Sequence, residues 1–159
     1  MVNLQLMKKE EIVKVLDWNM NTVEFLEQWS NFTYPLTKEQ YEERMESKDF
    51  VVYSIYDDTT MIGTIQMFQM DSERKYTKVG CFLINPELRG KGYGEQAMNA
   101  VLHKIFTEKP EGLGYKTVAL NVWDYNNGAQ RCYEKCGFKK VSEQLRPNGL
   151  VCYGMEKTI

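Results

Sequence analysis

The sequence predicts an α/β fold in which helices flank a mixed β-sheet. Two observations favour this class. Runs of β-branched and aromatic residues alternate with segments whose apolar residues recur at helical spacing, and the order of elements both begins and ends with strands. The 159 residues are 43% hydrophobic and 26% charged, which is typical of a globular domain. Because no repeat, low-complexity tract or linker interrupts the chain, we expect one domain over residues 1–159.

The N-terminal half combines a short strand, several helices and a β-hairpin. Its helical segments carry apolar residues at three- and four-residue intervals, and Thr37 is a suitable N-cap for the last of them. The hairpin is indicated by β-branched and aromatic residues on both sides of Asp57 and Asp58. The elements expected here are a strand at residues 2–7, helices at 8–18, 22–29 and 37–48, and a hairpin at 49–70.

Strands and helices alternate in the C-terminal half. A continuous apolar run over residues 116–123 predicts a strand that is buried on both faces. The helix before it has one apolar stripe, formed by Ala97, Met98, Val101, Leu102, Ile105 and Phe106. The helix after it closes at Gly137, and the last two strands turn at Pro147-Asn148-Gly149. The elements expected are strands at 78–86 and 116–123, helices beginning at 92 and 126, and a strand pair at 138–157.

Composition and charge argue against several classes of function. The first residues contain no long apolar segment, so we expect no signal peptide, no membrane span and a cytoplasmic protein. A net charge of -2 argues against a nucleic-acid partner. Acidic residues are in excess in the first half of the chain and basic residues in the second. This asymmetry would suit a fold that presents a cationic ligand on one side and an anionic ligand on the other, or simply unevenly charged solvated faces.

The cysteines do not form a metal-binding or redox pattern. The chain has 4 Cys and 1 His, with no Cys-x-x-Cys spacing, and His103 cannot complete a zinc site with them at sensible intervals. We therefore expect no metal, a structural role for His103, and reduced cysteines that contribute to packing. The cysteines are Cys81, Cys132, Cys136 and Cys152.

A glycine-rich segment connects a strand to a helix at residues 89–94. The first turn of a helix leaves backbone N–H groups without internal partners, and glycines without Cβ atoms let a bulky anion approach them. Arg89 and Lys91 add positive charge, so a diphosphate is a natural ligand. A Rossmann motif would need a glycine where Ala97 stands, and a P-loop would need Gly-Lys-Ser/Thr. A connection without any ligand is the alternative.

A second motif lies one strand further along the chain. Asn126, Ala129 and Tyr133 are followed by Gly137-Phe138. Together with Arg89, Gly92 and Gly94, this pattern resembles the GNAT superfamily of acyl-CoA-dependent N-acetyltransferases. The signature of that family is Arg/Gln-x-x-Gly-x-Gly/Ala followed by Asn-x-x-Ala-x-x-x-Tyr-x-x-x-Gly-Phe. The order of elements is similar over nearly the whole chain and weakens before about residue 50. The resemblance implies a single-domain fold whose mixed sheet is mostly antiparallel.

The resemblance also implies a set of site residues, with acetyl-CoA as cosubstrate. The pantetheine arm would lie along Phe82, Leu83 and Ile84 through main-chain hydrogen bonds, where an N–H could polarise the thioester carbonyl. Tyr133 would be the general acid that protonates the leaving thiolate, although a core tyrosine would occupy the same position. Asn126 would bind the cofactor arm, a role that is compatible with capping its helix. The diphosphate would bind the N–H groups of Gly90, Lys91, Gly92, Tyr93, Gly94 and Glu95.

The general base is not defined by the resemblance. Relatives often use a glutamate on the strand before the tyrosine helix, but Asn121 stands where we would look for it, and asparagine cannot accept the proton. Asp124 is nearby and could accept the proton. A chain of water molecules could also accept it, or the substrate could arrive already deprotonated. The other carboxylates considered are Glu24, Glu27 and Asp71. The acceptor pocket is expected near residues 29–37, where Trp29, Phe32 and Tyr34 either line it or belong to the core.

The expected activity is transfer of an acetyl group from acetyl-CoA to a primary amine of a small molecule by direct attack, the acceptor being a small metabolite, an amino sugar or a polyamine-like molecule. Acetylation of a protein N-terminus or lysine, and acyl-CoA sensing without catalysis, are the alternatives. The acidic N-terminal half favours a cationic amine. We expect neither nucleic-acid nor membrane partners. A homodimer is possible, because relatives often pair through their C-terminal strands.

Overall fold

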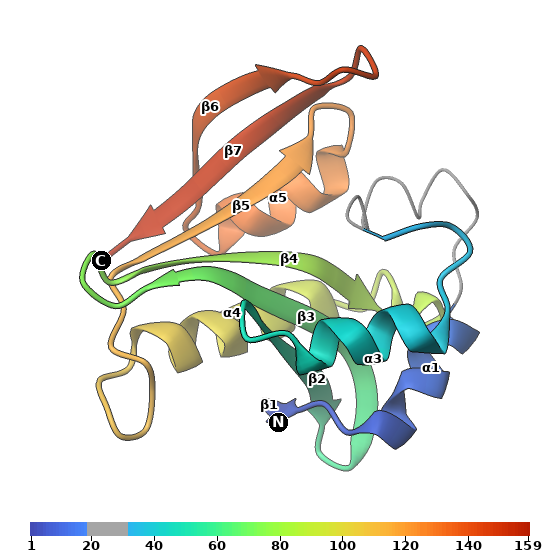
Figure 1. The fold of residues 1–159 in the computed structure, drawn as a ribbon. Coiled ribbons are helices and arrows are strands. Elements are labelled where there is room, and N and C mark those ends of the chain that lie inside the picture. Colours follow the sequence, from blue (N-terminus) through green and yellow to red (C-terminus); the bar gives the residue numbers. More distant parts are fainter. Residues whose placement is uncertain (19–31) are drawn as a thin grey trace.

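The computed structural model describes residues 1–18 and 32–159, and its centre is a seven-stranded sheet (Figure 1). The strand order is β1-β2-β3-β4-β5-β7-β6, and every neighbouring pair is antiparallel except β4 and β5. The expected mixed, mostly antiparallel sheet is thus confirmed. The strands are β1 Val2–Leu6, β2 Phe50–Asp57, β3 Thr60–Asp71, β4 Tyr76–Ile84, β5 Thr117–Trp123, β6 Lys139–Leu145 and β7 Val151–Thr158.

Helices cover both faces of the sheet. One layer contains α1 and α3 and packs on β2, β3 and β4, while α4 and α5 lie on the opposite face (Figure 1). The helical elements are α1 Ile12–Asp17, α3 Lys38–Glu46, α4 Tyr93–Phe106 and α5 Asn127–Lys135, with 3-10 turns at Lys9–Glu11 and Pro86–Leu88. The helix expected at 22–29 lies outside the described residues. In the described ranges, none of the helices has the length and hydropathy needed to cross a lipid bilayer.

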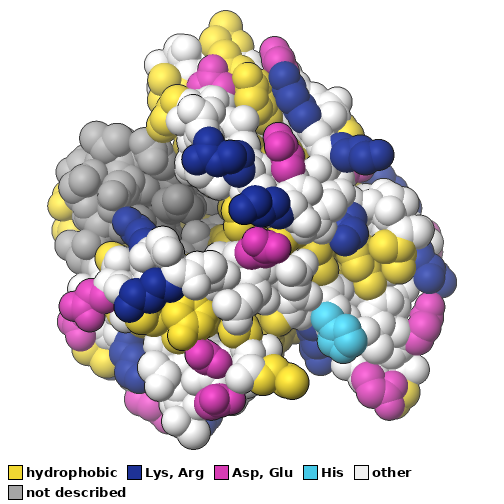
Figure 2. Space-filling model, turned by 180° about the vertical axis from the view of Figure 1, so that it is seen from behind, with side chains coloured by type: hydrophobic (Ala, Val, Ile, Leu, Met, Phe, Trp, Pro, Cys, Tyr) yellow, Lys and Arg dark blue, Asp and Glu magenta, His cyan; other side chains and the backbone are white. Residues whose placement is uncertain are grey.

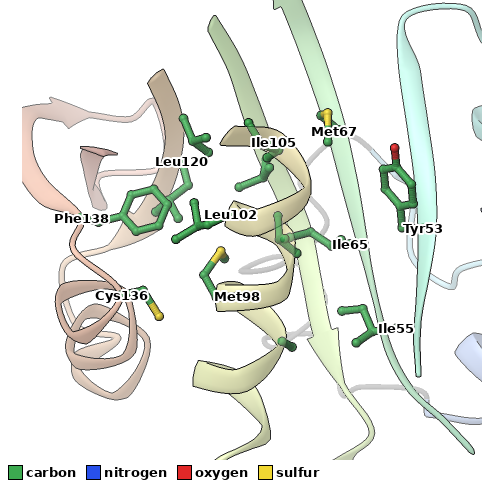
Figure 3. Packing of buried hydrophobic residues seen from close by; sticks show 14 of the residues in the cluster. Tyr53, Ile55, Ile65, Met67, Met98, Leu102, Ile105, Leu120, Cys136 and Phe138 are labelled. Carbon is green, nitrogen blue, oxygen red and sulfur yellow. The ribbon is translucent and has the colours of Figure 1, made fainter. Parts of the chain in front are cut away.

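The main core lies between the sheet and α4. Met98 and Leu102 of α4 lie on the side of Leu120 and Phe138, and Ile65 of β3 belongs to the same buried cluster (Figure 3). Of the predicted apolar stripe, only Phe106 is more than slightly exposed. The apolar stripe that predicts α4 therefore also stabilises its packing on the sheet, because burial of each of these side chains removes apolar surface from water.

Predicted helix ends and turns recur in the structure. Thr37 caps α3, since its side chain accepts a hydrogen bond from the Gln40 N–H at 3.3 Å. Gly137 follows α5 with a φ of 97°, a backbone conformation that glycine adopts without steric cost. Gly149 has a φ of 82° in the turn between β6 and β7. These local signals are short-range, which is why the sequence alone reveals them.

The prediction that β5 is buried on both faces is wrong at one position. Val118, Leu120 and Val122 are buried against the layer of α4 and α5, but Asn121 on the other face is exposed. β4 covers β5 only at its start, because Tyr76, Thr77 and Lys78 pair with Thr117, Val118 and Ala119, and pairing then stops. The two strands diverge from this point (Figure 1).

A β-bulge in β4 lies where the strands diverge. Thr64 of β3 pairs with Leu83 and Gln66 pairs with Gly80, so β4 has one residue more than β3 over this interval. Cys81, within the bulge, has a φ of 50°, which is unusual for a residue other than glycine. The extra residue reverses the alternation of side chains, so that Phe82 contacts the same core as Val79.

Glu11 ties the N-terminal layer to the sheet. Its carboxylate is 6% exposed and accepts hydrogen bonds from the Lys8 N–H at 2.8 Å, from the Ser54 hydroxyl at 3.1 Å and from the Tyr56 hydroxyl. Burial by itself would raise the pKa of this carboxyl. The three hydrogen bonds outweigh burial and hold the pKa below its usual value.

Glu11→Gln should lower the free energy of unfolding at pH 7 by about 1–3 kcal/mol, because charge-assisted hydrogen bonds are replaced by weaker ones. A lowered folded-state pKa stabilises the protein above the unfolded-state value and loses its effect as pH falls. The difference between the two proteins should therefore shrink below about pH 4. Urea denaturation at several pH values measures it, with exposed Glu10→Gln as the control. A difference that is constant with pH would contradict the assignment.

Candidate active site

Two cavities meet where β4 and β5 diverge. The first, here called the glycine-loop cavity, lies between the end of β4, residues 88–94 and the start of α5, and has a volume of about 620 Å³. The second, here called the strand cavity, lies between β4, β5 and the turn of β6 and β7, and has a volume of about 680 Å³. Phe82 and Tyr133 line both cavities. Whatever occupies the two cavities would therefore meet at these side chains.

Most residues expected to bind the cofactor line the glycine-loop cavity. They are Phe82, Leu83, Ile84, Arg89, Gly90, Gly92, Tyr93, Gly94 and Asn126, together with Tyr133. Lys91 and Glu95 do not line it: Lys91 is exposed on the loop, and Glu95 is half-buried on the first turn of α4. The backbone N–H groups of these two residues still belong to the same loop and helix start.

Unpaired donors gather at the start of α4. Gly90 and Gly92 have φ values of 77° and 84°, which bring the chain from the loop into the helix. The first N–H of this region with a protein acceptor is that of Gln96, which donates to the Gly92 carbonyl at 3.3 Å. From Gly90 to Glu95, no N–H donates to an acceptor in the part of the chain that the structure describes.

The geometry of this loop leaves room for an anionic group. A Cβ placed on Gly90 would have no atom within 4 Å, so the loop is open to a large group on that side. The positive end of the dipole of α4, a helix of 14 residues, adds to the free N–H groups. Tyr93 fixes the helix start, because its hydroxyl donates to Asp57 at 2.9 Å. The donors are thus oriented without any ligand.

Beyond Lys78, the edge of β4 that faces β5 pairs with no strand of the described residues. Phe82 and Ile84 are half-buried against the main core, whereas the Leu83 side chain is buried in the opposite layer. The main chain of this segment can therefore pair with an extended ligand as a strand would.

Tyr133 is half-buried on α5, at the junction of the two cavities. Burial raises the pKa of its hydroxyl well above the ordinary value, and the thiols of Cys132 and Cys136 raise it further. Its ring contacts Phe138 edge to face, with 6.0 Å between centroids. No described residue forms a hydrogen bond with the hydroxyl. A protonated phenol is thus held in place, able to donate to a ligand.

Asn126 caps α5. Its side-chain oxygen accepts from the Ala129 N–H at 3.2 Å, and its side-chain nitrogen forms no hydrogen bond with the residues of 1–18 or 32–159. The nitrogen can therefore donate to a ligand in the glycine-loop cavity while the oxygen holds the helix.

The structure narrows the choice of general base. Asn121 lines the strand cavity and Asp124 lines neither cavity. Asp71 accepts from the N–H groups of Glu73 and Arg74 at 3.1 and 3.0 Å, so its carboxylate closes the turn after β3. Glu24 and Glu27 lie outside the described residues. No carboxylate of the described residues lines the strand cavity.

Of the aromatic residues expected at the acceptor pocket, the two that the structure describes, Phe32 and Tyr34, do not line the strand cavity. Phe32 stacks on Tyr41 with 6.0 Å between ring centroids and belongs to the layer of α1 and α3. Tyr34 is 40% exposed, and Trp29 lies outside the described residues. The aromatic side chains that do line this cavity beside Phe82 and Tyr133 are Phe50, Phe68 and Trp123.

Three cations of the strand cavity were missed by sequence analysis. Arg44, Lys78 and Arg146 come from α3, β4 and the residue after β6. They are far apart in the sequence, so no spacing links them. The excess of acidic residues in the first half of the chain therefore does not predict the charge of the side chains that line this cavity. Acidic and basic side chains are also interspersed on the face of the molecule that Figure 2 shows, which is the back of the view in Figure 1.

The described residues form neither a metal site nor a disulfide bond. No group of three His, Cys, Asp or Glu side chains is placed to hold a metal ion there. All four cysteines are free; Cys136 and Cys152 are buried, and Cys81 and Cys132 are half-buried.

Comparisons with known proteins agree with the geometry. Residues 12–138 match the family model described as Acetyltransferase (GNAT) family. The SPbeta prophage-derived uncharacterized N-acetyltransferase YokL of Bacillus subtilis is 30% identical over 149 residues, which are 87% of this chain and 77% of that protein. Probable N-acetyltransferase YjcK of the same organism is 28% identical over 116 residues, 70% of this chain and 62% of that protein.

A solved structure has the same fold. The spermidine N-acetyltransferase of Vibrio cholerae, in complex with CoA and spermine, superposes with a TM-score of 0.81 at 18% identity, covering 99% of this chain and 95% of that one. The match of the family model over most of the chain, the similar relatives and a glycine loop that fits CoA lead to one conclusion: this protein belongs to the GNAT family of acetyl-CoA-dependent N-acetyltransferases.

Proposed function

We propose that the protein transfers the acetyl group of acetyl-CoA to a primary amine of a small molecule by direct attack. The observation that carries this proposal is the meeting of two cavities at Phe82 and Tyr133. The glycine-loop cavity suits the anionic cofactor, and the strand cavity suits an acceptor. The thioester would lie between them.

The cofactor would be held mainly by main-chain atoms. The diphosphate accepts hydrogen bonds from the N–H groups between Gly90 and Glu95, with Arg89 and Lys91 adding positive charge. The pantetheine arm runs along Phe82, Leu83 and Ile84 at the unpaired edge of β4, and Asn126 donates to it from its side-chain nitrogen. Acetyl-CoA supplies an acyl thioester whose carbonyl oxygen gains charge when it is attacked. A main-chain N–H of β4 would stabilise that charge.

Tyr133 would complete the reaction as the general acid. The amine nitrogen forms a bond with the acetyl carbon, the carbon–sulfur bond breaks, and the leaving thiolate takes the phenolic proton. The nitrogen, now positively charged, loses a proton to solvent water, and water returns a proton to the Tyr133 phenolate. Tyr133 is protonated at neutral pH, because the pKa of an ordinary phenol is already about 10 and burial raises the pKa of this one further, so the proton is in place when sulfur develops charge. An amine that enters as the free base needs no carboxylate in the strand cavity. Proton loss to water would serve an amine that enters charged.

A small acceptor is favoured over a protein by the size and position of the strand cavity. Its 680 Å³ lie between β4, β5 and the turn of β6 and β7, a volume typical of small-molecule sites. The solved structure named above holds spermine, itself a small amine. A screen of amines for thiol release from acetyl-CoA tests the activity. Binding of CoA without turnover on any amine would instead indicate an acyl-CoA sensor.

Tyr133→Phe should lower kcat by at least about tenfold and leave the Kd for acetyl-CoA nearly unchanged, because the phenol acts only as charge develops on sulfur. Thiol-release kinetics and calorimetry measure the two quantities. Tyr115→Phe is a control, since Tyr115 lines neither cavity. An unchanged kcat in Tyr133→Phe would remove this residue from the mechanism.

Asn126 can be tested for its two roles with two substitutions. Asn126→Ala should lower the free energy of unfolding by about 1 kcal/mol because the cap of α5 is lost, whereas Asn126→Ser should restore the cap. If the side-chain nitrogen also binds the cofactor, both variants raise the KM for acetyl-CoA. If Asn126→Ser had both the stability and the KM of the wild type, Asn126 would act only as a helix cap and not in cofactor binding.

A further inference from the structure

The charged lining of the strand cavity is entirely cationic among the residues described. Arg44, Lys78 and Arg146 line it, and no Asp or Glu of those residues does. The uncharged polar side chains that line it are Gln69, Asn121 and Asn148, with Tyr133 at its junction with the glycine-loop cavity. A ligand with a second cationic amine would meet Lys78 and Arg146 there, and none of the described carboxylates lines the cavity to bind it.

Arg44 is fixed by the protein itself. Its Nη1 donates to Gln66 Oε1 at 2.7 Å, and its guanidinium carbon lies 4.1 Å from the ring centroids of both Phe32 and Phe50. These contacts hold the guanidinium in one position at the side of the cavity. Arg44 is therefore part of the packed wall of the cavity. A ligand contact from Lys78 or Arg146 would displace no such packing of the described aromatic rings.

Lys78 and Arg146 are directed toward the cavity without an acidic partner. Neither forms an ion pair with a described residue. Arg146 is half-buried, although every other residue between Lys139 and Leu150 is exposed. Its side chain thus points inward from a hairpin that is otherwise exposed to solvent. Partial burial of a cation costs free energy unless a partner compensates for it, so this orientation indicates that a ligand binds there.

The two cations disfavour each other. Burial lowers the pKa of Lys78, and the positive charge of Arg146 lowers it further. An anion bound between them would relieve this repulsion and supply the missing counter-charge.

We propose that the acceptor carries an anionic group, a carboxylate or a phosphate, at the end remote from its amine, and that Lys78 and Arg146 bind that group. The inference rests on the proposed function and names its substrate class. On β3, the partners of Lys78 and Leu83 are Phe68 and Thr64, which are separated by about 13 Å of strand, so Lys78 and Phe82 lie somewhat closer together than that. The Lys78 side chain spans part of this distance. An amine at the junction of the cavities would therefore be separated from its anionic group by a chain of up to roughly six atoms. A polyamine does not fit this description.

Three amines of equal chain length test the inference: 6-aminohexanoate, hexylamine and 1,6-diaminohexane. We expect kcat/KM to be highest for 6-aminohexanoate, by about tenfold or more over hexylamine, as one charge-assisted hydrogen bond would give. 1,6-Diaminohexane should be the poorest substrate. 6-Aminohexyl phosphate, as a fourth substrate, shows whether phosphate is preferred to carboxylate.

Charge reversal links the preference to the cavity. Arg146→Glu should abolish the advantage of 6-aminohexanoate and raise kcat/KM for 1,6-diaminohexane, and Lys78→Gln should reduce the same advantage. Lys139→Glu makes an identical change of charge on exposed β6, outside the cavity, and should keep the wild-type preference. Unchanged calorimetric binding of CoA shows that each variant is folded.

The outcomes separate the inference from the proposed function. Turnover with hexylamine or 1,6-diaminohexane preferred, or with all three amines equal, would overturn the inference and leave the acetyl transfer standing. Absence of turnover with every amine would count against the proposed function. In that case the N-acetylated products are titrated into the CoA-bound protein. Tighter binding of the anionic product, lost in Arg146→Glu, would support the inference, and equal binding would overturn it.

Discussion

The divergence of β4 from β5 is the constraint on which the site depends. The strands pair over three residues of each, and the bulge at Cys81 follows at once. A sheet that continued its pairing would fill the space of both cavities and satisfy the donors along β4. Because pairing stops at Lys78, main-chain groups of β4 are left for a ligand, and the cavities meet at Phe82.

The same principle operates at the start of α4. A helix cannot satisfy the N–H groups of its own first turn, and here the preceding loop does not satisfy them either. Two sets of free main-chain donors, one on β4 and one on α4, therefore line one cavity. They are held in place by the core beneath α4 and by the contact of Tyr93 with Asp57. Rigid packing thus orients groups that the fold itself does not use.

The sequence predicts features that arise from neighbours along the chain. The apolar stripe of α4, the cap at Thr37 and the turn after α5 follow from local spacing, and the glycine loop from its helix start. The exposure of the Asn121 side chain and the bulge at Cys81 depend on how β4 pairs with strands that are distant in the sequence. For the same reason, the cations of the strand cavity could not be predicted, since charge counted over half a chain says nothing about which side chains converge.

Binding of the diphosphate by main-chain N–H groups at the start of α4 can be observed directly in amide chemical shifts. ¹⁵N-labelled protein is titrated with CoA and, separately, with pantetheine, which lacks the diphosphate. We expect CoA to shift the amide resonances of Gly90, Gly92 and Gly94, and pantetheine to leave them largely unchanged while it shifts those of β4. Saturating CoA that perturbs only resonances elsewhere would contradict it.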